Sequence, residues 1–132
     1  MSETGGRRRL AAILAADAVG YSRLMTEDED ATVAALDAAR AVFKVRIERN
    51  QGRIIDMAGD SVLAVFETAA GAVNAALAIQ KELNVPADAM PEERCMRFRI
   101  GVHIGDVIQK ADGTLYGDGV NIAARLQALA EP

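Results

Sequence analysis

Residues 53–66, RIIDMAGDSVLAVF, decide the fold of this chain. Residues 53–57 and 61–66 have the length and composition of strands, and Ala58-Gly59-Asp60 between them is short enough for a tight turn. The stretch therefore predicts a β-hairpin made of two antiparallel strands.

Helices are expected on both sides of this hairpin. Before it, Thr26-Glu27-Asp28-Glu29 matches a capping box that would open a long helix, and Gly52 would end that helix. After it, Thr68 would cap a second helix. Residues at helical spacing would face the core in each helix. They are Val33, Leu36, Phe43 and Ile47 in the first helix, and Val73, Ala76, Leu77, Gln80 and Leu83 in the second.

Strands are predicted further out on both sides. Residues 9–16 form an apolar run typical of a buried strand, and residues 96–104 alternate as a strand does. Residues 106–110 would add a short extra strand, and 118–130 a C-terminal helix. The order strand, helix, strand, strand, helix, strand predicts an α+β fold of the ferredoxin-like type, the split βαβ or βαββαβ arrangement. Its helices would cover one face of a mostly antiparallel sheet.

Length and composition narrow the class of protein. A chain of 132 residues with 51% hydrophobic and 26% charged residues fits one globular domain, with a flexible leader at 1–7 and the domain at 8–132. A net charge of −4 argues against nucleic acid as a partner, because phosphate backbones require clustered basic charge. The single cysteine excludes an intrachain disulfide and favours a cytoplasmic location. No apolar run reaches the roughly 18 residues of a membrane span.

Two aspartates stand out by their position. Asp17 ends the first predicted strand and Asp60 lies at the tip of the hairpin, so the ferredoxin-like topology would bring both carboxylates to one sheet edge. Mg²⁺ typically takes one or two carboxylates and completes its shell with phosphate oxygens and water. The segment 18–22 leads into a helix, and its backbone N–H groups could hold phosphates. On spacing alone, both aspartates could equally be ordinary turn residues.

Four motifs in order carry a family resemblance. They are LAADAVGYS at 14–22, AGDS at 58–61, RIGVHIGDV at 99–107 and YGDGVNIAARL at 116–126. Together they resemble the catalytic domain of class III nucleotidyl cyclases of the bacterial adenylate/guanylate type, over residues 8–132. Any one motif is weak, whereas four in order on the expected fold are specific.

The resemblance implies a reaction and its residues. Such cyclases convert a nucleoside triphosphate to its 3′,5′-cyclic monophosphate and pyrophosphate, with two metal ions, Mg²⁺ or Mn²⁺, in each active site. By the match, Asp17, Asp60 and the carbonyl of Ala18 would bind both ions. Val19, Gly20, Tyr21 and Ser22 would hold the phosphates. Asn121 would orient the ribose, and Arg125 would stabilise charge on the α-phosphoryl group.

The resemblance also implies a homodimer. In this family each active site is shared head to tail, with metal aspartates from one chain and base and transition-state residues from the other. A single domain that carries both sets would form two symmetric sites. The family domain also continues past the position of Pro132 with strands that supply a triphosphate-binding lysine, so this domain is expected to be incomplete at its C-terminus.

Two positions would recognise the base. Asp56 lies where adenylate cyclases of this family often carry Lys and guanylate cyclases carry Glu, and Thr114 is the partner position. An ionised Asp56 can only accept hydrogen bonds, which suits guanine, whereas the hydroxyl of Thr114 serves either base. The abundance of bacterial adenylate cyclases favours cyclic AMP as the product. A guanylate cyclase and a catalytically silent nucleotide-binding or regulatory module remain the alternatives.

Overall fold

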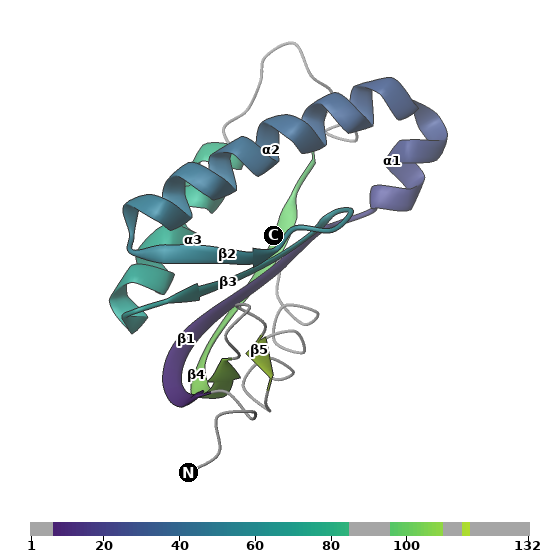
Figure 1. The fold of residues 1–132 in the computed structure, drawn as a ribbon. Coiled ribbons are helices and arrows are strands. Elements are labelled where there is room, and N and C mark those ends of the chain that lie inside the picture. The colour runs from purple at the N-terminus through teal and green to yellow at the C-terminus, as the bar shows by residue number, and fades with distance from the viewer. Residues whose placement is uncertain (1–6, 85–95, 110–114, 117–132) are drawn as a thin grey trace.

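The computed structural model describes residues 7–84, 96–109 and 115–116, which form five strands and three helices. Figure 1 shows the helices gathered on one side of a twisted sheet. The elements in chain order are β1 (Arg7–Ala18), α1 (Tyr21–Glu27), α2 (Glu29–Arg49), β2 (Gly52–Asp56), β3 (Ser61–Phe66), α3 (Ala69–Leu83), β4 (Phe98–Gln109) and β5 (Leu115–Tyr116).

The sheet has the strand order β2-β3-β1-β4-β5, and every neighbouring pair is antiparallel. The first four strands reproduce the predicted ferredoxin-like order, with the chain's first strand in the interior. The predicted fold class is therefore confirmed for the residues that the structure describes. The predicted helix at 118–130 lies outside them.

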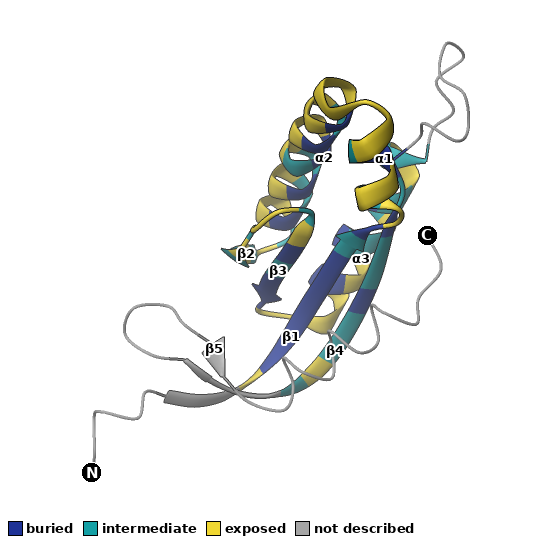
Figure 2. Ribbon diagram, turned by 90° about the vertical axis from the view of Figure 1, so that its right-hand side faces the viewer, coloured by how far each residue is buried: buried dark blue, intermediate teal, exposed yellow. Residues whose placement is uncertain are grey.

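Residues 11–16 of strand β1 are apolar because both faces of the strand are covered there. Ala12, Leu14 and Ala16 join the main core under the helices, where the rings of Phe43 and Phe98 meet edge to face at 5.0 Å. Ala11, Ile13 and Ala15 form a second cluster on the opposite face together with Val65. Figure 2 shows this strand as the most continuously buried part of the sheet. A strand segment that is buried on both faces has a continuous apolar sequence instead of alternating polar and apolar residues.

The start of the long helix differs from the prediction. Thr26 lies inside α1 and donates its hydroxyl to the carbonyl of Ser22 at 2.9 Å. The cap is Asp28, whose carboxylate accepts the N–H of Ala31 at 3.0 Å. The extended backbone of Asp28 separates α1 from α2, so the predicted helix begins at Glu29 and α1 is a separate short helix that the sequence did not predict. Both residues can cap a helix, and only the local backbone decides between them.

The end of that helix also differs. Helix α2 ends at Arg49, and Gln51, not Gly52, takes the left-handed backbone with φ 60°. Gly52 is the first residue of β2, where a Cβ atom would come within 2.5 Å of the Phe66 ring. Gly52 therefore serves close packing, and the predicted C-terminal cap is wrong.

The predicted faces are confirmed only in part, because Leu36, Phe43 and Ile47 of α2 are buried and Ala76 and Leu83 of α3 pack against the core, whereas three predicted residues are exposed. Val33, Val73 and Leu77 are 43%, 46% and 65% exposed. The buried residues are Thr32, Leu36, Ala39, Phe43 and Ile47 in α2, and Gly71, Ala72, Ala75 and Ile79 in α3. Small residues on α3 allow a close approach, because a Cβ atom on Gly71 would lie 2.5 Å from the carbonyl oxygen of Asn50. The predicted cap of α3 is confirmed, since the Thr68 hydroxyl accepts the N–H of Gly71 at 2.9 Å.

The last two predicted strands are one. Strand β4 runs without a break through Gly105, which pairs with Ala11 of β1, so the predicted extra strand at 106–110 is the end of β4. The extra strand is β5 instead, which pairs with β4. The predicted alternation is confirmed, because Phe98, Ile100 and Val102 all lie in or against the main core.

Candidate active site

Asp17 lies near the end of β1 on the sheet face opposite the helices. It pairs with Ser61 of β3 on one side and with Arg99 of β4 on the other. Alternation along β1 gives Asp17 the same face as Ala15, which belongs to the second cluster. Its side chain is 26% exposed, so the carboxylate stands at the rim of the buried sheet.

Asp60 comes from the tip of the β2–β3 hairpin, where Gly59 takes a left-handed backbone with φ 57°. The Oδ2 atom of Asp60 accepts the backbone N–H of Ala18 at 3.2 Å. Ala18 directly follows Asp17 in the sequence, so this hydrogen bond holds the Asp60 carboxylate against the backbone next to Asp17. The structure thus brings the two predicted metal aspartates together, along with the backbone of Ala18.

The segment after β1 turns sharply into α1. The N–H of Val19 donates to the carbonyl of Arg97 at 2.8 Å, and Gly20 then takes a left-handed backbone with φ 67°. A residue with a Cβ atom would be strained at that φ. Tyr21 begins α1 and packs against the main core, whereas Ser22 is exposed. The predicted phosphate-holding residues therefore form a compact turn beside both aspartates.

Arg99 is the neighbour that the sequence did not reveal. Its Nε atom donates to Oδ1 of Asp17 and its Nη2 atom to Oδ2, both at 3.1 Å. A guanidinium that faces a carboxylate with two parallel hydrogen bonds is a directional, charge-assisted contact. The alternation of residues 96–104 places Arg99 on the correct face, but its pairing with Asp17 depends on the register of β1 and β4, which the sequence does not show.

Asp56 reaches the same face through an irregularity in β2. Ile54 pairs with Ala64 and Asp56 with Leu63, so Ile55 is an extra residue, a β-bulge. Ile54 packs in the main core, whereas Leu63 packs on the second cluster. Because it pairs with Leu63, Asp56 lies on the face that carries Asp17, and its side chain is exposed.

The other predicted site residues, Thr114, Asn121 and Arg125, lie outside the described residues. Within the described ranges, no group of three or more His, Cys, Asp or Glu residues could hold a metal ion. The donor set here is two carboxylates and a backbone segment. This set fits Mg²⁺, which needs few protein ligands when phosphate oxygens and water supply the rest.

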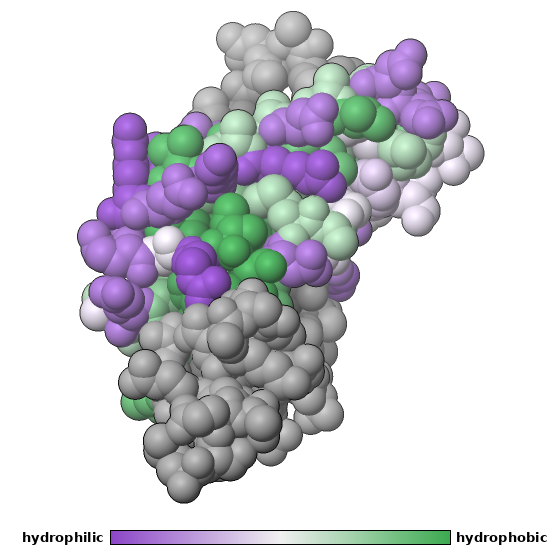
Figure 3. Space-filling view, in the orientation of Figure 1, coloured by the Kyte–Doolittle hydropathy of each residue, from purple (hydrophilic) through white to green (hydrophobic). Residues whose placement is uncertain are grey.

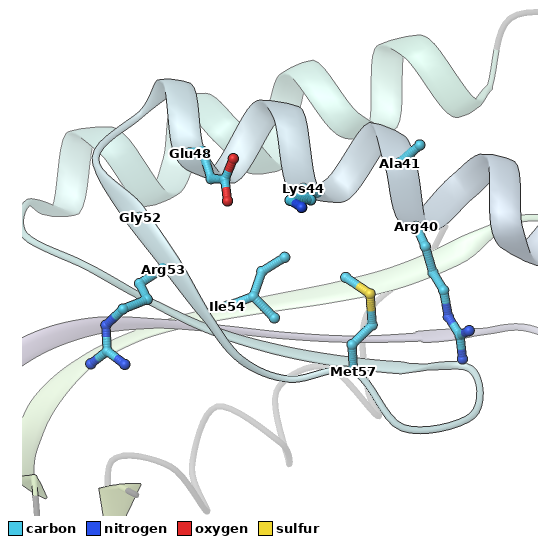
Figure 4. A pocket seen from close by; sticks show the side chains of 8 residues that line it. All are labelled: Arg40, Ala41, Lys44, Glu48, Gly52, Arg53, Ile54 and Met57. Carbon is cyan, nitrogen blue, oxygen red and sulfur yellow. The ribbon is translucent and has the colours of Figure 1, made fainter. Parts of the chain in front are cut away.

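A separate hollow lies between α2 and the edge strand β2. It has a volume of about 590 Å³, with Ile54 and Met57 as its apolar part and Arg40, Lys44, Glu48 and Arg53 around them. Figure 4 shows these side chains, and Figure 3 shows the area as an apolar patch bordered by hydrophilic groups. The hollow lies on the helix side of β2, so it is distinct from the site at Asp17.

Comparison with known proteins identifies a family. The model of the adenylate and guanylate cyclase catalytic domain matches residues 7–132. A Rhizobium meliloti protein named "Putative adenylate cyclase 3" is 47% identical over the whole chain, and an adenylate cyclase of Glutamicibacter nicotianae is 34% identical over 89% of it. The chain spans only 22% and 28% of the lengths of these two relatives.

Solved structures agree with this result. A crystal structure of an adenylate/guanylate cyclase/hydrolase from Silicibacter pomeroyi is 41% identical, with a TM-score of 0.86, over 96% of this chain and 73% of that protein. A bacterial light-regulated adenylyl cyclase follows with a TM-score of 0.82 at 26% identity, over 93% of this chain and 71% of its own. Within the part that the structure describes, no helix is long and apolar enough to cross a membrane.

Proposed function

The chain belongs to the adenylate and guanylate cyclase catalytic domain family, and we propose that it converts ATP to 3′,5′-cyclic AMP and pyrophosphate. The family supports a cyclase, and the relatives named as adenylate cyclases support ATP as the substrate. The observation that carries the proposal is the hydrogen bond from the backbone N–H of Ala18 to the Asp60 carboxylate, which places Asp60 beside the residue that follows Asp17, at the edge of a turn suited to phosphates.

In the proposed reaction, the ribose 3′-oxygen attacks the α-phosphorus and loses its proton. The bond between the α-phosphorus and the bridging oxygen breaks, and pyrophosphate leaves. Asp17, Asp60 and the carbonyl of Ala18 would hold two Mg²⁺ or Mn²⁺ ions, which would favour the ionised 3′-oxygen and neutralise the triphosphate. Both carboxylates sit at the sheet rim, where a triphosphate can approach.

The remaining steps belong to binding and orientation. Residues 19–22 would hold the β- and γ-phosphates against the start of α1. Asn121 would orient the ribose, and Arg125 would stabilise the charge that develops on the α-phosphoryl group in the transition state. These two residues are four apart in the sequence, so on the predicted helix they would project from one face.

We further propose that the active unit is a homodimer with two shared sites. One chain would supply Asp17 and Asp60, and its partner would supply the base-recognising residues with Asn121 and Arg125. A symmetric pair of identical chains then forms two equivalent sites. We propose the cytoplasm as the location, in keeping with a nucleoside triphosphate substrate and a single cysteine.

A second candidate is guanylate cyclase activity, which the position of Asp56 favours. Its exposed carboxylate lies on the same face as Asp17, and a carboxylate can accept hydrogen bonds from guanine N1–H and the 2-amino group. Thr114 would complete the base contacts in either case.

The test is product formation by the protein that carries this domain, with ATP or GTP and with Mg²⁺ or Mn²⁺. We expect cyclic AMP from ATP, and its loss in Asp60→Asn, which keeps the size of the side chain but not its charge. Formation of cyclic GMP from GTP, with no cyclic AMP from ATP, would favour the second candidate. The absence of a cyclic product from either nucleotide would refute the cyclase proposal. The catalytically silent nucleotide-binding or regulatory module would then be the remaining interpretation.

A further inference from the structure

The tip of the β2–β3 hairpin carries Asp60 but has few restraints. Ala58 and Gly59 are exposed, and a Cβ atom on Gly59 would meet nothing within 4 Å in the described structure. In the described ranges, three hydrogen bonds engage the tip. One closes the turn, from the N–H of Ser61 to the carbonyl of Ala58 at 3.0 Å, and one joins Asp60 to Ala18.

The third hydrogen bond comes from helix α2. Arg40 donates from its Nη2 atom to the carbonyl oxygen of Gly59, the residue just before Asp60. Figure 4 shows the Arg40 side chain reaching from the helix to the loop. Its neighbours along the helix, Ala39 and Phe43, are 3% and 0% exposed, so the helix at this point is fixed in the core. Arg40 therefore ties a loose tip to a rigid element.

Arg40 gains little stability from its other contacts. Its Nε atom is buried and lacks a hydrogen-bond partner within the described residues, which is unfavourable. Its ion pair with Asp37 is long, at 3.9 Å, and the Asp37 side chain is 68% exposed. The contact with Gly59 is thus the main directional role that the structure offers to this guanidinium.

We propose that Arg40 is a positioning residue that sets the place of the Asp60 carboxylate, and through it the affinity of the site for divalent cations. The inference rests on the proposed function for the role of Asp60, but the restraint on the hairpin tip stands independently. Arg40 would act only through the hairpin tip, without touching the reacting atoms or a phosphate.

The first test measures the restraint without any activity. Residue-resolved amide hydrogen exchange compares Arg40→Ala with Arg46→Ala, a matched control on the same helix that loses an ion pair with Glu82. In Arg40→Ala we expect the amides of Ala18 and Ser61 to exchange several-fold faster, because both of their hydrogen bonds depend on the tip. Unchanged exchange at both amides, or equal acceleration in Arg46→Ala, would overturn the proposal.

The second test concerns the cation. The Mn²⁺ concentration for half-maximal activity should rise several-fold in Arg40→Ala, with a smaller change in kcat, while Arg40→Lys should recover part of the loss. A fall in kcat alone, at unchanged Mn²⁺ dependence, would contradict a positioning role. If no variant, including the unaltered protein, forms a cyclic product, the proposed function fails and the exchange result still decides the restraint.

Discussion

The ion pair between Asp17 and Arg99 predicts that Arg99→Gln will strengthen the binding of Mn²⁺ in the absence of nucleotide. In the structure the guanidinium covers both carboxylate oxygens of Asp17, each at 3.1 Å. A cation that binds the same carboxylate must displace or share these hydrogen bonds. Removal of the guanidinium removes that competition.

The size of the effect follows from the exposure of the pair. The two side chains are 33% and 26% exposed, so solvent screens their attraction in part. Pairs of this kind contribute about 1 kcal/mol, which corresponds to roughly a fivefold change in an equilibrium constant. Arg99→Lys keeps the charge but loses the two parallel hydrogen bonds, so its effect should be smaller.

The assay is a Mn²⁺ titration of the nucleotide-free protein, followed by the electron paramagnetic resonance signal of free Mn²⁺. Arg97→Gln is the control, because it removes one charge from the same segment two residues away. A fivefold gain in Arg99→Gln with little change in the control is the expected result. Equal gains in Mn²⁺ affinity in both variants would mean that the loss of a nearby positive charge, not the loss of the hydrogen bonds to Asp17, causes the effect. Weaker binding in Arg99→Gln would refute competition and show instead that Arg99 holds Asp17 in its binding geometry.

Three further predictions concern the dimer, the core and the base. Asp17→Ala and Arg125→Ala should each abolish cyclic nucleotide formation. An equal mixture of the two variants should recover about a quarter of the unaltered protein's activity, since half of the randomly formed dimers carry one intact site of two. No recovery would contradict shared sites. Gly71→Ala should lower the free energy of unfolding in urea by about 1–3 kcal/mol, because the added Cβ atom meets the carbonyl of Asn50 at 2.5 Å, and an unchanged midpoint would contradict this packing. Asp56→Lys should raise the ratio of ATP to GTP turnover, because an ammonium group can only donate hydrogen bonds; an unchanged ratio would remove Asp56 from base recognition.

The strands could be predicted more closely than the helix faces. Alternation in β4 and the hairpin turn at 58–60 follow from a period of two residues, and pairing confirms both. In α3, by contrast, alanine occurs around the helix and is equally acceptable inside and outside. The larger Val73 and Leu77 therefore suggest the wrong face. The side of α3 that packs against the rest of the protein carries small residues, and Gly71 on that side lies close to the backbone of Asn50.

The meeting of Asp17 and Asp60 could be predicted because topology alone decides it. The first strand of a ferredoxin-like sheet ends beside the hairpin of its neighbour, whatever the detailed register. The contact between Asp17 and Arg99 could not be predicted, since it joins residues 82 positions apart through the register of two strands. Similarly, Arg40 reaches Gly59 across 19 positions, and no motif marks that pair.

The β-bulge at Ile55 shows why residue type alone does not define the base-recognising position. Strict alternation would give Ile54 and Asp56 the same face, and Ile54 packs in the core under the helices. Asp56 would then point away from Asp17. The extra residue reverses this, because it pairs Asp56 with Leu63 and returns Met57 to the main core. The role proposed for Asp56 therefore depends on the β-bulge as much as on the carboxylate, because regular pairing that kept Ile55 would turn Asp56 toward the helices. Deletion of Ile55 should instead leave Asp56 on the face of Asp17, since Asp56 would then directly follow Ile54 and alternate with it.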